Sequence, residues 1–214
     1  MSKKYLVVGA TGLMGTTLVN QIPLNEDVTV IARRKINYKR PVQFLSLDED
    51  IRLPDADHLF ICLGYPLELR DLLVMRETIK AKFKAIDYDL VIRIAEAARK
   101  SNIKSVSIIS SVEAHPKSLN YYLKVKGQME NKIKELGFES VNIFRPSHLL
   151  GKREKQLTLD VKIFEFFTNI TGKFLLGPFK KYKNIQAQKL AAAMYEKSNK
   201  MSNTFDIFTF KDFS

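Results

Sequence analysis

The stretch that decides the fold is "KYLVVGATGLMG", residues 4–15. A short apolar run, typical of a buried strand, leads directly into a G-x-x-G-x-x-G loop, after which apolar residues recur every four positions, as on one face of a helix. Glycine permits a tight turn and lets backbone N–H groups approach a pyrophosphate, while the N-terminus of the following helix favours negative charge. A structural turn is the alternative, but the position between strand and helix favours a dinucleotide-binding loop. The residues expected to contact the dinucleotide are Gly9, Thr11, Gly12, Leu13, Met14 and Gly15.

Strand-like and helix-like segments alternate along most of the chain. Several strand-like runs are almost continuously apolar, as expected where helices cover both faces of a parallel sheet. We therefore predict an α/β fold with a doubly wound parallel sheet, a single Rossmann domain spanning residues 1–214. The predicted strands are 4–9, 27–32, 41–47, 57–64, 103–111, 139–144 and a short one within 204–210, and the predicted helices are one beginning near 14 and those at 67–82, 87–100, 121–136 and 184–198.

Composition and charge bear on whether the protein binds nucleic acid or metal and on its compartment. The 214 residues carry a formal net charge of +12, but the lysines are dispersed and accompany no nucleic-acid-binding motif, so we expect a solvated basic surface rather than a nucleic-acid partner. The three histidines lack metal-ligand spacing, and we expect no metal site. The chain has one cysteine, its first residues do not resemble a leader peptide, and no apolar run is long enough to span a membrane. Together these features predict a cytoplasmic protein.

The second predicted strand ends in "VIARRK", residues 30–35. In dinucleotide sites, an acidic residue near this position accepts hydrogen bonds from the ribose 2′-OH of NAD, whereas arginine favours the 2′-phosphate of NADP. Arg33 and Arg34 therefore predict NADP(H) as the cofactor, with two solvated arginines as the alternative. Ligands of such sheets lie at the carboxyl ends of the strands. The contacts expected on that ground are Asp48 at the adenine edge, and Leu63 and Gly64 along the cofactor.

The stretch "YYLKVKG", residues 121–127, offers two tyrosines, of which one is expected to handle a proton. On a helix, the first of them belongs to an apolar stripe facing the sheet, and we expect it in the core. The stripe consists of Tyr121, Val125, Met129 and Ile133.

Tyr122 and Lys126 are also four residues apart, one step around the helix from this stripe, where a helix meets a cleft. A nearby ammonium favours the phenolate form of a tyrosine, so the pair can give or take a proton near neutral pH. The fifth predicted strand ends in "IISS", residues 108–111, and a serine hydroxyl there can hydrogen-bond a substrate carbonyl and stabilise developing negative charge.

The segments "GATGLMG", "ISS", "YLKVKG" and "IFRPSHLLGKRE" resemble the small, atypical branch of the short-chain dehydrogenase/reductase superfamily. They are similar to the Tat-interacting oxidoreductase type of NADPH-binding proteins and their bacterial relatives, over about residues 4–155. The resemblance implies an extended-type Rossmann fold with a small C-terminal substrate lobe, mainly from residues 147–183. It also implies a catalytic triad of Ser111, Tyr122 and Lys126, with Ser110 as the alternative serine.

By the same resemblance, Lys126 also hydrogen-bonds the nicotinamide ribose, and Pro146 and Ser147 lie beside the nicotinamide. Ser111 and Tyr122 are eleven residues apart, which is tighter than in most of the superfamily but similar to this branch. No residue of the sequence can be assigned to the asparagine that completes the active site in many relatives.

These features predict an NADPH-dependent oxidoreductase that reduces a small carbonyl-type substrate by hydride transfer with a Ser-Tyr-Lys triad. The apolar segment 160–179 suggests a hydrophobic substrate, with ordinary core packing as the alternative. An NADPH-binding regulatory or partner-binding protein with little turnover is a second reading of the same features, and an epimerase or dehydratase of the superfamily is a third. We expect a monomer or a homodimer.

Overall fold

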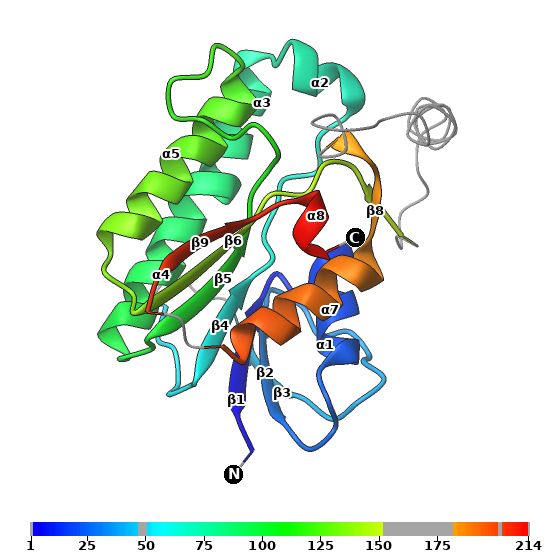
Figure 1. The fold of residues 1–214 in the computed structure, drawn as a ribbon, viewed down its shortest axis with the longest axis vertical. Helices are drawn as coiled ribbons and strands as arrows, with labels where there is room; N and C mark the ends of the chain where they lie inside the picture. The colour runs from blue at the N-terminus through cyan, green and yellow to red at the C-terminus, as the bar shows by residue number, and fades with distance from the viewer. Residues whose placement is uncertain (1, 47–50, 152–181, 201–202, 214) are drawn as a thin grey trace.

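Seven parallel strands form one sheet in the order β3-β2-β1-β4-β5-β6-β9 (Figure 1). The structure, a computed structural model, describes residues 2–46, 51–151, 182–200 and 203–213. The predicted doubly wound α/β fold is confirmed. The strands are β1 (Lys4–Val8), β2 (Asp27–Ala32), β3 (Gln43–Ser46), β4 (His58–Ile61), β5 (Ser105–Ile109), β6 (Ser140–Phe144) and β9 (Phe205–Phe208), and a separate two-stranded parallel sheet pairs β7 (Leu149–Leu150) with β8 (Ile185–Gln186).

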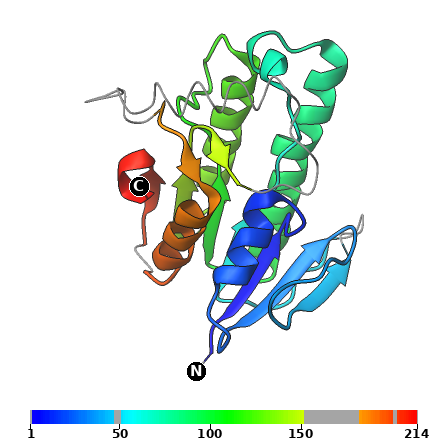
Figure 2. The same cartoon turned by 90° about the vertical axis from the view of Figure 1, so that its right-hand side faces the viewer.

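Helices cover both faces of the large sheet, and each strand therefore contributes to two apolar cores. In β1, Leu6 and Val8 pack with residues of α4 and α5, whereas Tyr5 and Val7 pack with residues of α1 and α7. Figures 1 and 2 show α1 and α7 side by side on one face, with α4 and α5 on the other. The described helices are α1 (Leu13–Gln21), α2 (Leu69–Leu73), α3 (Glu77–Lys84), the π-helical segment η1 (Ala85–Leu90), α4 (Val91–Lys100), α5 (Tyr121–Glu135), α7 (Ala187–Ser198) and α8 (Phe210–Phe213).

One predicted boundary is wrong. The sequence suggested separate helices at 67–82 and 87–100, but the structure has a short α2 followed by one uninterrupted helical run over residues 77–100, formed by α3, η1 and α4. The physical reason is that no glycine or proline lies between residues 77 and 100, so nothing in the sequence ends a helix there. The wider π-helical segment in the middle rotates the side chains that follow it.

A buried polar network crosses the middle of the sheet. His58 of β4 is 1% exposed, and its Nδ1 and Nε2 atoms lie 2.8 Å from the hydroxyl oxygens of Ser105 and Ser107 on the neighbouring strand β5. The amide of Asn142 on β6 donates to the Ser107 hydroxyl at 3.3 Å. Burial, and then the positive charge of Lys3, lower the pKa of His58 to about 3. The imidazole is therefore neutral at physiological pH and serves the structure of the sheet.

We predict that His58 makes folding stability fall in acid. The unfolded chain takes up a proton near the ordinary pKa of 6.5, whereas the folded protein takes it up only near about 3, so the stabilisation is complete above 6.5 and is lost progressively between these values. One such group contributes a slope of up to about 1.4 kcal/mol per pH unit. Urea unfolding of His58→Gln across this range should show a shallower slope than the wild type.

The exposed His115 provides the matched control, because His115→Gln also removes one imidazole but should keep the wild-type slope. Parallel pH profiles for His58→Gln and the wild type would contradict the role given to the buried ring.

Candidate functional site

The candidate site lies at the carboxyl edge of the large sheet, where the strand order reverses. The chain runs from β1 through β2 to β3 in one direction, then returns to β4 on the other side of β1 and continues outward. Such a reversal leaves a crevice above the neighbouring strands, and it is the usual ligand position in open α/β sheets.

Two of the three loop glycines are required by the packing of the protein itself. Gly9 has a φ of +79°, and a Cβ atom there would lie 2.6 Å from the carbonyl oxygen of Cys62, at the end of β4. A Cβ atom on Gly15 would overlap the carbonyl oxygen of Gly9, because α1 begins in close contact with the loop. These glycines fix the angle between β1 and α1.

Gly12 differs, and it provides the test of whether a dinucleotide can be accommodated. A Cβ atom on this exposed residue would meet only the Gly9 carbonyl oxygen, at an unstrained 3.5 Å, so the surrounding protein does not require a glycine. Gly12 is the N-cap of α1, and no side chain caps the helix there. The N–H groups of the first turn are therefore available to an anion that approaches the backbone closely.

The remaining loop residues occupy different environments. Thr11 and Leu13 are half-buried, whereas Met14 is 5% exposed with its side chain in the core, so only its backbone N–H can face a ligand. Tyr38, in the segment after β2, donates its hydroxyl to the carbonyl of Ala10 at 3.2 Å. This hydrogen bond ties the segment that follows β2 to the glycine loop.

Arg33 and Arg34 directly follow β2 and are both exposed. Because β2 pairs with β1 over its length, the two arginines leave the sheet one strand away from the glycine loop. The placement is compatible with contacts to the adenosine end of a dinucleotide bound across β1 and β2. Asp48, expected at the adenine edge, lies outside the described residues.

Helix α5 begins with a side-chain cap that also reaches helix α2. The side chain of Asn120 accepts a hydrogen bond from the N–H of Leu123 at 3.2 Å and donates one to the carbonyl of Leu72 at 2.7 Å. Further along the helix, a Cβ atom on Gly127 would lie 2.6 Å from the Cα atom of His115. The glycine that ends "YYLKVKG" therefore lets the chain between β5 and α5 cross close to the helix.

The predicted stripe on α5 is largely as expected, with one difference. Val125, Met129 and Ile133 are buried at 2% exposure or less, but Tyr121 is only half-buried. Its ring packs edge-on against Phe83 of α3, with the centroids 6.5 Å apart, rather than on the sheet. The first turn of α5 thus contacts α3, and for that reason a sheet-facing stripe does not extend to its first residue.

Tyr122 is also half-buried, and its ring lies 5.3 Å from that of Phe83. The two tyrosines consequently share one small apolar cluster with Phe83 and Met75. What distinguishes them is Lys126, since the charge interaction between Tyr122 and Lys126 is among the causes that raise the pKa of the lysine.

Lys126 is held inside the protein by a carboxylate that the sequence analysis did not single out. Its Nζ atom lies 2.7 Å from Oδ1 of Asp87 in η1, and the two side chains are only 5% and 3% exposed. The same ammonium donates to the carbonyl of Ile109, at the end of β5, at 3.4 Å. Burial works to lower the pKa of Lys126, but Asp87, and after it Tyr122, outweigh burial, so the net pKa is raised and the ammonium stays charged.

The sequence did contain a signal for Asp87. It lies four residues before Val91, and it therefore belongs to the face of the helix that carries the buried Val91, Ala95 and Ala98. A carboxylate on an apolar face needs a partner, and removing one member of a buried pair costs about 3–5 kcal/mol. Its position could have been predicted; its partner could not.

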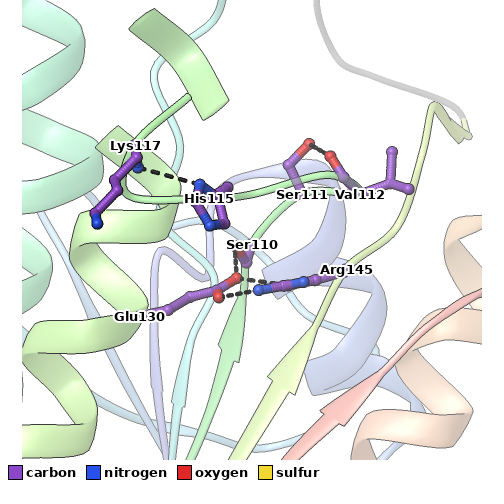
Figure 3. Close-up of polar contacts among 7 residues, drawn as sticks. All are labelled: Ser110, Ser111, Val112, His115, Lys117, Glu130 and Arg145. Atoms are coloured by element: carbon purple, nitrogen blue, oxygen red, sulfur yellow. Dashed lines mark hydrogen bonds and ion pairs between the residues drawn. The ribbon is translucent and has the colours of Figure 1, made fainter. Parts of the chain in front are cut away.

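The two serines after β5 have different partners. Ser110 donates its hydroxyl to Oε1 of Glu130, a buried residue of α5 whose carboxylate also accepts two hydrogen bonds from Arg145, at 2.9 and 2.5 Å. Figure 3 shows Ser110 directed toward this pair and Ser111 directed away from it. Ser111 is 7% exposed, and among the described residues its hydroxyl donates to the neighbouring carbonyl of Val112, at 3.2 Å. The geometry favours Ser111 over Ser110 as the serine available to a substrate.

Two residues named by the resemblance, Pro146 and Ser147, and two expected from the sheet topology, Leu63 and Gly64, lie at the same edge. Pro146 is buried, and its carbonyl accepts the N–H of Val112 at 3.0 Å, while Ser147 donates its hydroxyl to the carbonyl of Lys183. Leu63 is half-buried against the core, and a Cβ atom on Gly64 would lie 4.0 Å from Oδ1 of Asp87. The structure thus brings Gly64 close to the Asp87–Lys126 pair.

Most of the expected substrate lobe lies outside the described residues. Of residues 147–183, only 147–151 and 182–183 are described, and the apolar segment 160–179 lies outside the described residues. Within the described ranges, no helix is long and apolar enough to cross a membrane, and no three or more His, Cys, Asp or Glu side chains are grouped as a metal site would require.

Solved structures share the fold of the chain. The fold matches MoeE5 in complex with UDP-glucose and NAD with a TM-score of 0.72 and 14% identity, covering 96% of this chain and 75% of that chain. It matches a short chain dehydrogenase family protein from Francisella tularensis with a TM-score of 0.65 and 16% identity, covering 97% of both chains. At these identities the likeness establishes the fold, which is that of the short-chain dehydrogenase/reductase type of Rossmann protein.

Sequence relatives define the family, although no family model matches the chain. Protein HTATIP2 of Rattus norvegicus is 30% identical over 189 residues, covering 82% of this chain and 75% of that protein. The mitochondrial protein FMP52 of Debaryomyces hansenii is 30% identical over 173 residues, covering 77% and 74%. The chain belongs to the HTATIP2/FMP52 family of atypical short-chain dehydrogenase/reductase-like proteins.

The expectation of a cytoplasmic protein is overturned by these relatives. The similar FMP52 proteins of Debaryomyces hansenii, Candida albicans and Saccharomyces cerevisiae are named as mitochondrial, and they point to that compartment rather than to the cytoplasm. The sequence argument failed because a lone buried cysteine excludes a disulfide framework but does not distinguish one compartment with reduced thiols from another.

The serine geometry predicts opposite roles for two neighbouring residues. Ser110→Ala removes a hydrogen bond from the buried Glu130 carboxylate and should lower the free energy of unfolding by about 1–3 kcal/mol, measured by urea denaturation. Ser111→Ala loses only a 3.2 Å bond to a neighbouring carbonyl and should change stability by less than about 0.5 kcal/mol. Equal losses in the two variants would contradict the assignment of Ser110 to the Glu130–Arg145 network.

Proposed function

We propose that the protein is an NADPH-dependent oxidoreductase that reduces a small carbonyl-type substrate. The observation that carries the proposal is the buried, charged Lys126 beside Tyr122, at the carboxyl edge of β5. A permanently charged ammonium next to a half-buried tyrosine is costly as a purely structural device, and it suits proton transfer.

In this proposal the glycine loop holds the pyrophosphate at the N-terminus of α1, where Gly12 leaves room for close approach. Arg33 and Arg34 bind the 2′-phosphate, and Lys126 holds the nicotinamide ribose. The likeness to MoeE5, a protein solved with NAD, supports a dinucleotide, and the arginines after β2 support the phosphorylated form.

When bound, NADPH supplies the hydride. The residues of the chain do the rest. The Ser111 hydroxyl donates a hydrogen bond to the substrate carbonyl oxygen and stabilises the negative charge that develops there. The Tyr122 hydroxyl gives its proton to that oxygen, and the Lys126 ammonium stabilises the charge left on the tyrosine oxygen. Ser110 and Glu130 take no part in the chemistry, because their polar atoms are bonded to each other and to Arg145.

A specific observation favours one alternative, an NADPH-binding regulator with little turnover. Val74 and Leu119 are 80% and 105% exposed, on the two segments that the Asn120–Leu72 hydrogen bond joins beside the first turn of α5. Exposed apolar side chains near a site suit contact with another protein. Tight NADPH binding, no oxidation across a broad panel of carbonyl compounds and a cofactor-dependent partner affinity would establish this alternative.

The names of several structural neighbours favour another alternative, epimerisation. One neighbour is a UDP-N-acetylglucosamine 4-epimerase from Methanobrevibacter ruminantium, with a TM-score of 0.73 at 16% identity. Turnover of nucleotide sugars without net consumption of the cofactor would replace the reductase proposal with this one.

The cofactor preference is directly testable. NADPH should bind more tightly than NADH, because Arg33 and Arg34 offer charge-assisted hydrogen bonds to the 2′-phosphate, and the double variant Arg33→Ala/Arg34→Ala should lose about tenfold or more in NADPH affinity with little change for NADH. Fluorescence titration measures both constants. Lys35→Ala is the matched control, since Lys35 is the next exposed cation and its ammonium lies over the Phe44 ring. Equal affinities for the two dinucleotides in the wild type would remove the role of the arginines.

The roles of the two tyrosines are testable once a substrate is found. Tyr122→Phe removes the proton donor and should lower kcat by about 10²–10⁴, whereas Tyr121→Phe should keep most of the activity. Steady-state kinetics of both variants at matched cofactor saturation decide between them.

The serines extend this test, because the activity should fall in Ser111→Ala and not in folded Ser110→Ala, which is the reverse of their order in stability. A Tyr122→Phe enzyme that retains full kcat would rule out the assigned proton donor.

A further inference from the structure

Asp87 has both carboxylate oxygens committed to different segments of the chain. Oδ1 lies 2.7 Å from the ammonium of Lys126 on α5, and Oδ2 accepts the backbone N–H of Tyr65 at 2.7 Å. Tyr65 belongs to the segment that follows β4, next to Gly64. One carboxylate therefore joins η1, α5 and the β4 segment at the edge of the candidate site.

The neighbouring acidic residue shows that this arrangement is not a general property of the helix. Asp89 also forms an ion pair, with Lys84 at 2.6 Å, but the side chains of Asp89 and Lys84 are 47% and 48% exposed. An exposed pair contributes little to stability and tolerates the loss of one partner. Asp87 is instead 2% exposed, and a carboxylate so deeply buried has to be fully hydrogen-bonded or paired.

We infer that Asp87 is a positioning residue for the proposed reaction: it keeps the Lys126 ammonium charged and fixed beside Tyr122, and it ties that ammonium to the β4 segment expected along the cofactor. The effect of Asp87 on the reaction rests on the proposed function. The contacts of Asp87 with Lys126 and Tyr65, called the clamp below, are a property of the protein alone.

The surroundings of Lys126 explain why a single carboxylate is decisive. The titratable groups that interact with its ammonium are Asp87 from η1, and Tyr122 and Glu130 from its own helix. Glu130 is already paired with Arg145 of the segment after β6 and accepts the Ser110 hydroxyl. Burial is the strongest influence on Lys126 and favours the neutral amine, and Asp87 is the largest influence that opposes it. Without Asp87, burial prevails and the lysine loses its proton at lower pH.

The first arm of the test measures the titration of Lys126 in the cofactor-free protein. Competitive labelling with an amine-reactive reagent across a pH series, read by mass spectrometry, gives the pKa of Lys126, with the exposed Lys124 as an internal reference. In the wild type the pKa should lie above the ordinary lysine value of about 10.4. Asp87→Asn should lower it below that value, and Asp89→Asn, the matched control on the same helical segment, should leave it unchanged.

The second arm measures NADPH affinity by fluorescence between about pH 6 and about pH 9, below the ordinary pKa of a lysine, with the wild type as the reference for the other groups that titrate in this range. Asp87→Asn should bind nearly as tightly as the wild type at the acid end and weaken by roughly tenfold toward the alkaline end, as Lys126 loses its charge. Asp87→Glu keeps the negative charge and should restore the flat profile of the wild type.

The outcomes separate the clamp from a merely structural role. A loss of affinity that is uniform across pH, or an unshifted Lys126 in Asp87→Asn, would overturn the inference. If Asp87→Asn does not fold, the wild-type titration decides alone, because a Lys126 pKa below the ordinary value contradicts the clamp. If the wild type does not bind NADPH, the proposed function fails, while the labelling arm still decides whether Asp87 holds the charge of Lys126.

Discussion

The buried ion pair between Asp87 and Lys126 is the interaction on which the candidate site depends. It joins α5 to the helical run 77–100, and through the N–H of Tyr65 it reaches the segment after β4. The π-helical segment η1 carries the Asp87 carboxylate. π-Helical segments change the direction of the side chains that follow them, and they are frequent at functional sites. Two helices on one face of the sheet are thereby held in the register that places the Lys126 ammonium at the end of β5.

A second polar network, formed by Ser110, Glu130 and Arg145, lies at the same carboxyl edge of the sheet. Glu130 binds both Arg145 and Ser110, so α5 is connected to the end of β5 and to the segment after β6 by charge-assisted hydrogen bonds. The network engages Ser110, whereas the hydroxyl of its neighbour Ser111 donates to the adjacent carbonyl of Val112. Ser110 is thereby committed to the structure of the protein, and Ser111 is the serine proposed to meet a substrate.

Much of the fold could be predicted from the sequence because it depends on local patterns. The glycine loop follows β1 and precedes α1 as predicted, and the apolar runs mark the strands of a parallel sheet. The break expected between residues 82 and 87 was wrong, because no helix-breaking residue lies there and the helix continues over 77–100. Tyr121 was expected on the sheet because helical spacing gives the direction of a side chain but not where the sheet ends.

The site could be predicted only where its chemistry follows from spacing along one element. The pairing of Tyr122 with Lys126 is such a case, being four residues on one helix. Asp87 lies far from Lys126 in the chain, and its role depends on how two helices pack, which one sequence does not reveal. The proposal of Ser111 rather than Ser110 likewise rests on the position of Glu130, which one sequence does not reveal. Localisation was misjudged because composition does not report the compartment.

The central claim is that one dinucleotide spans the edge of the sheet from the glycine loop to Lys126. A crystal structure of the protein grown with NADPH tests it most directly. The account predicts the pyrophosphate at the N-terminus of α1, the 2′-phosphate against Arg33 and Arg34, and the nicotinamide ribose within hydrogen-bond distance of the Lys126 ammonium. A nucleotide bound elsewhere, or one whose nicotinamide end lies away from Lys126 and Tyr122, would contradict the account.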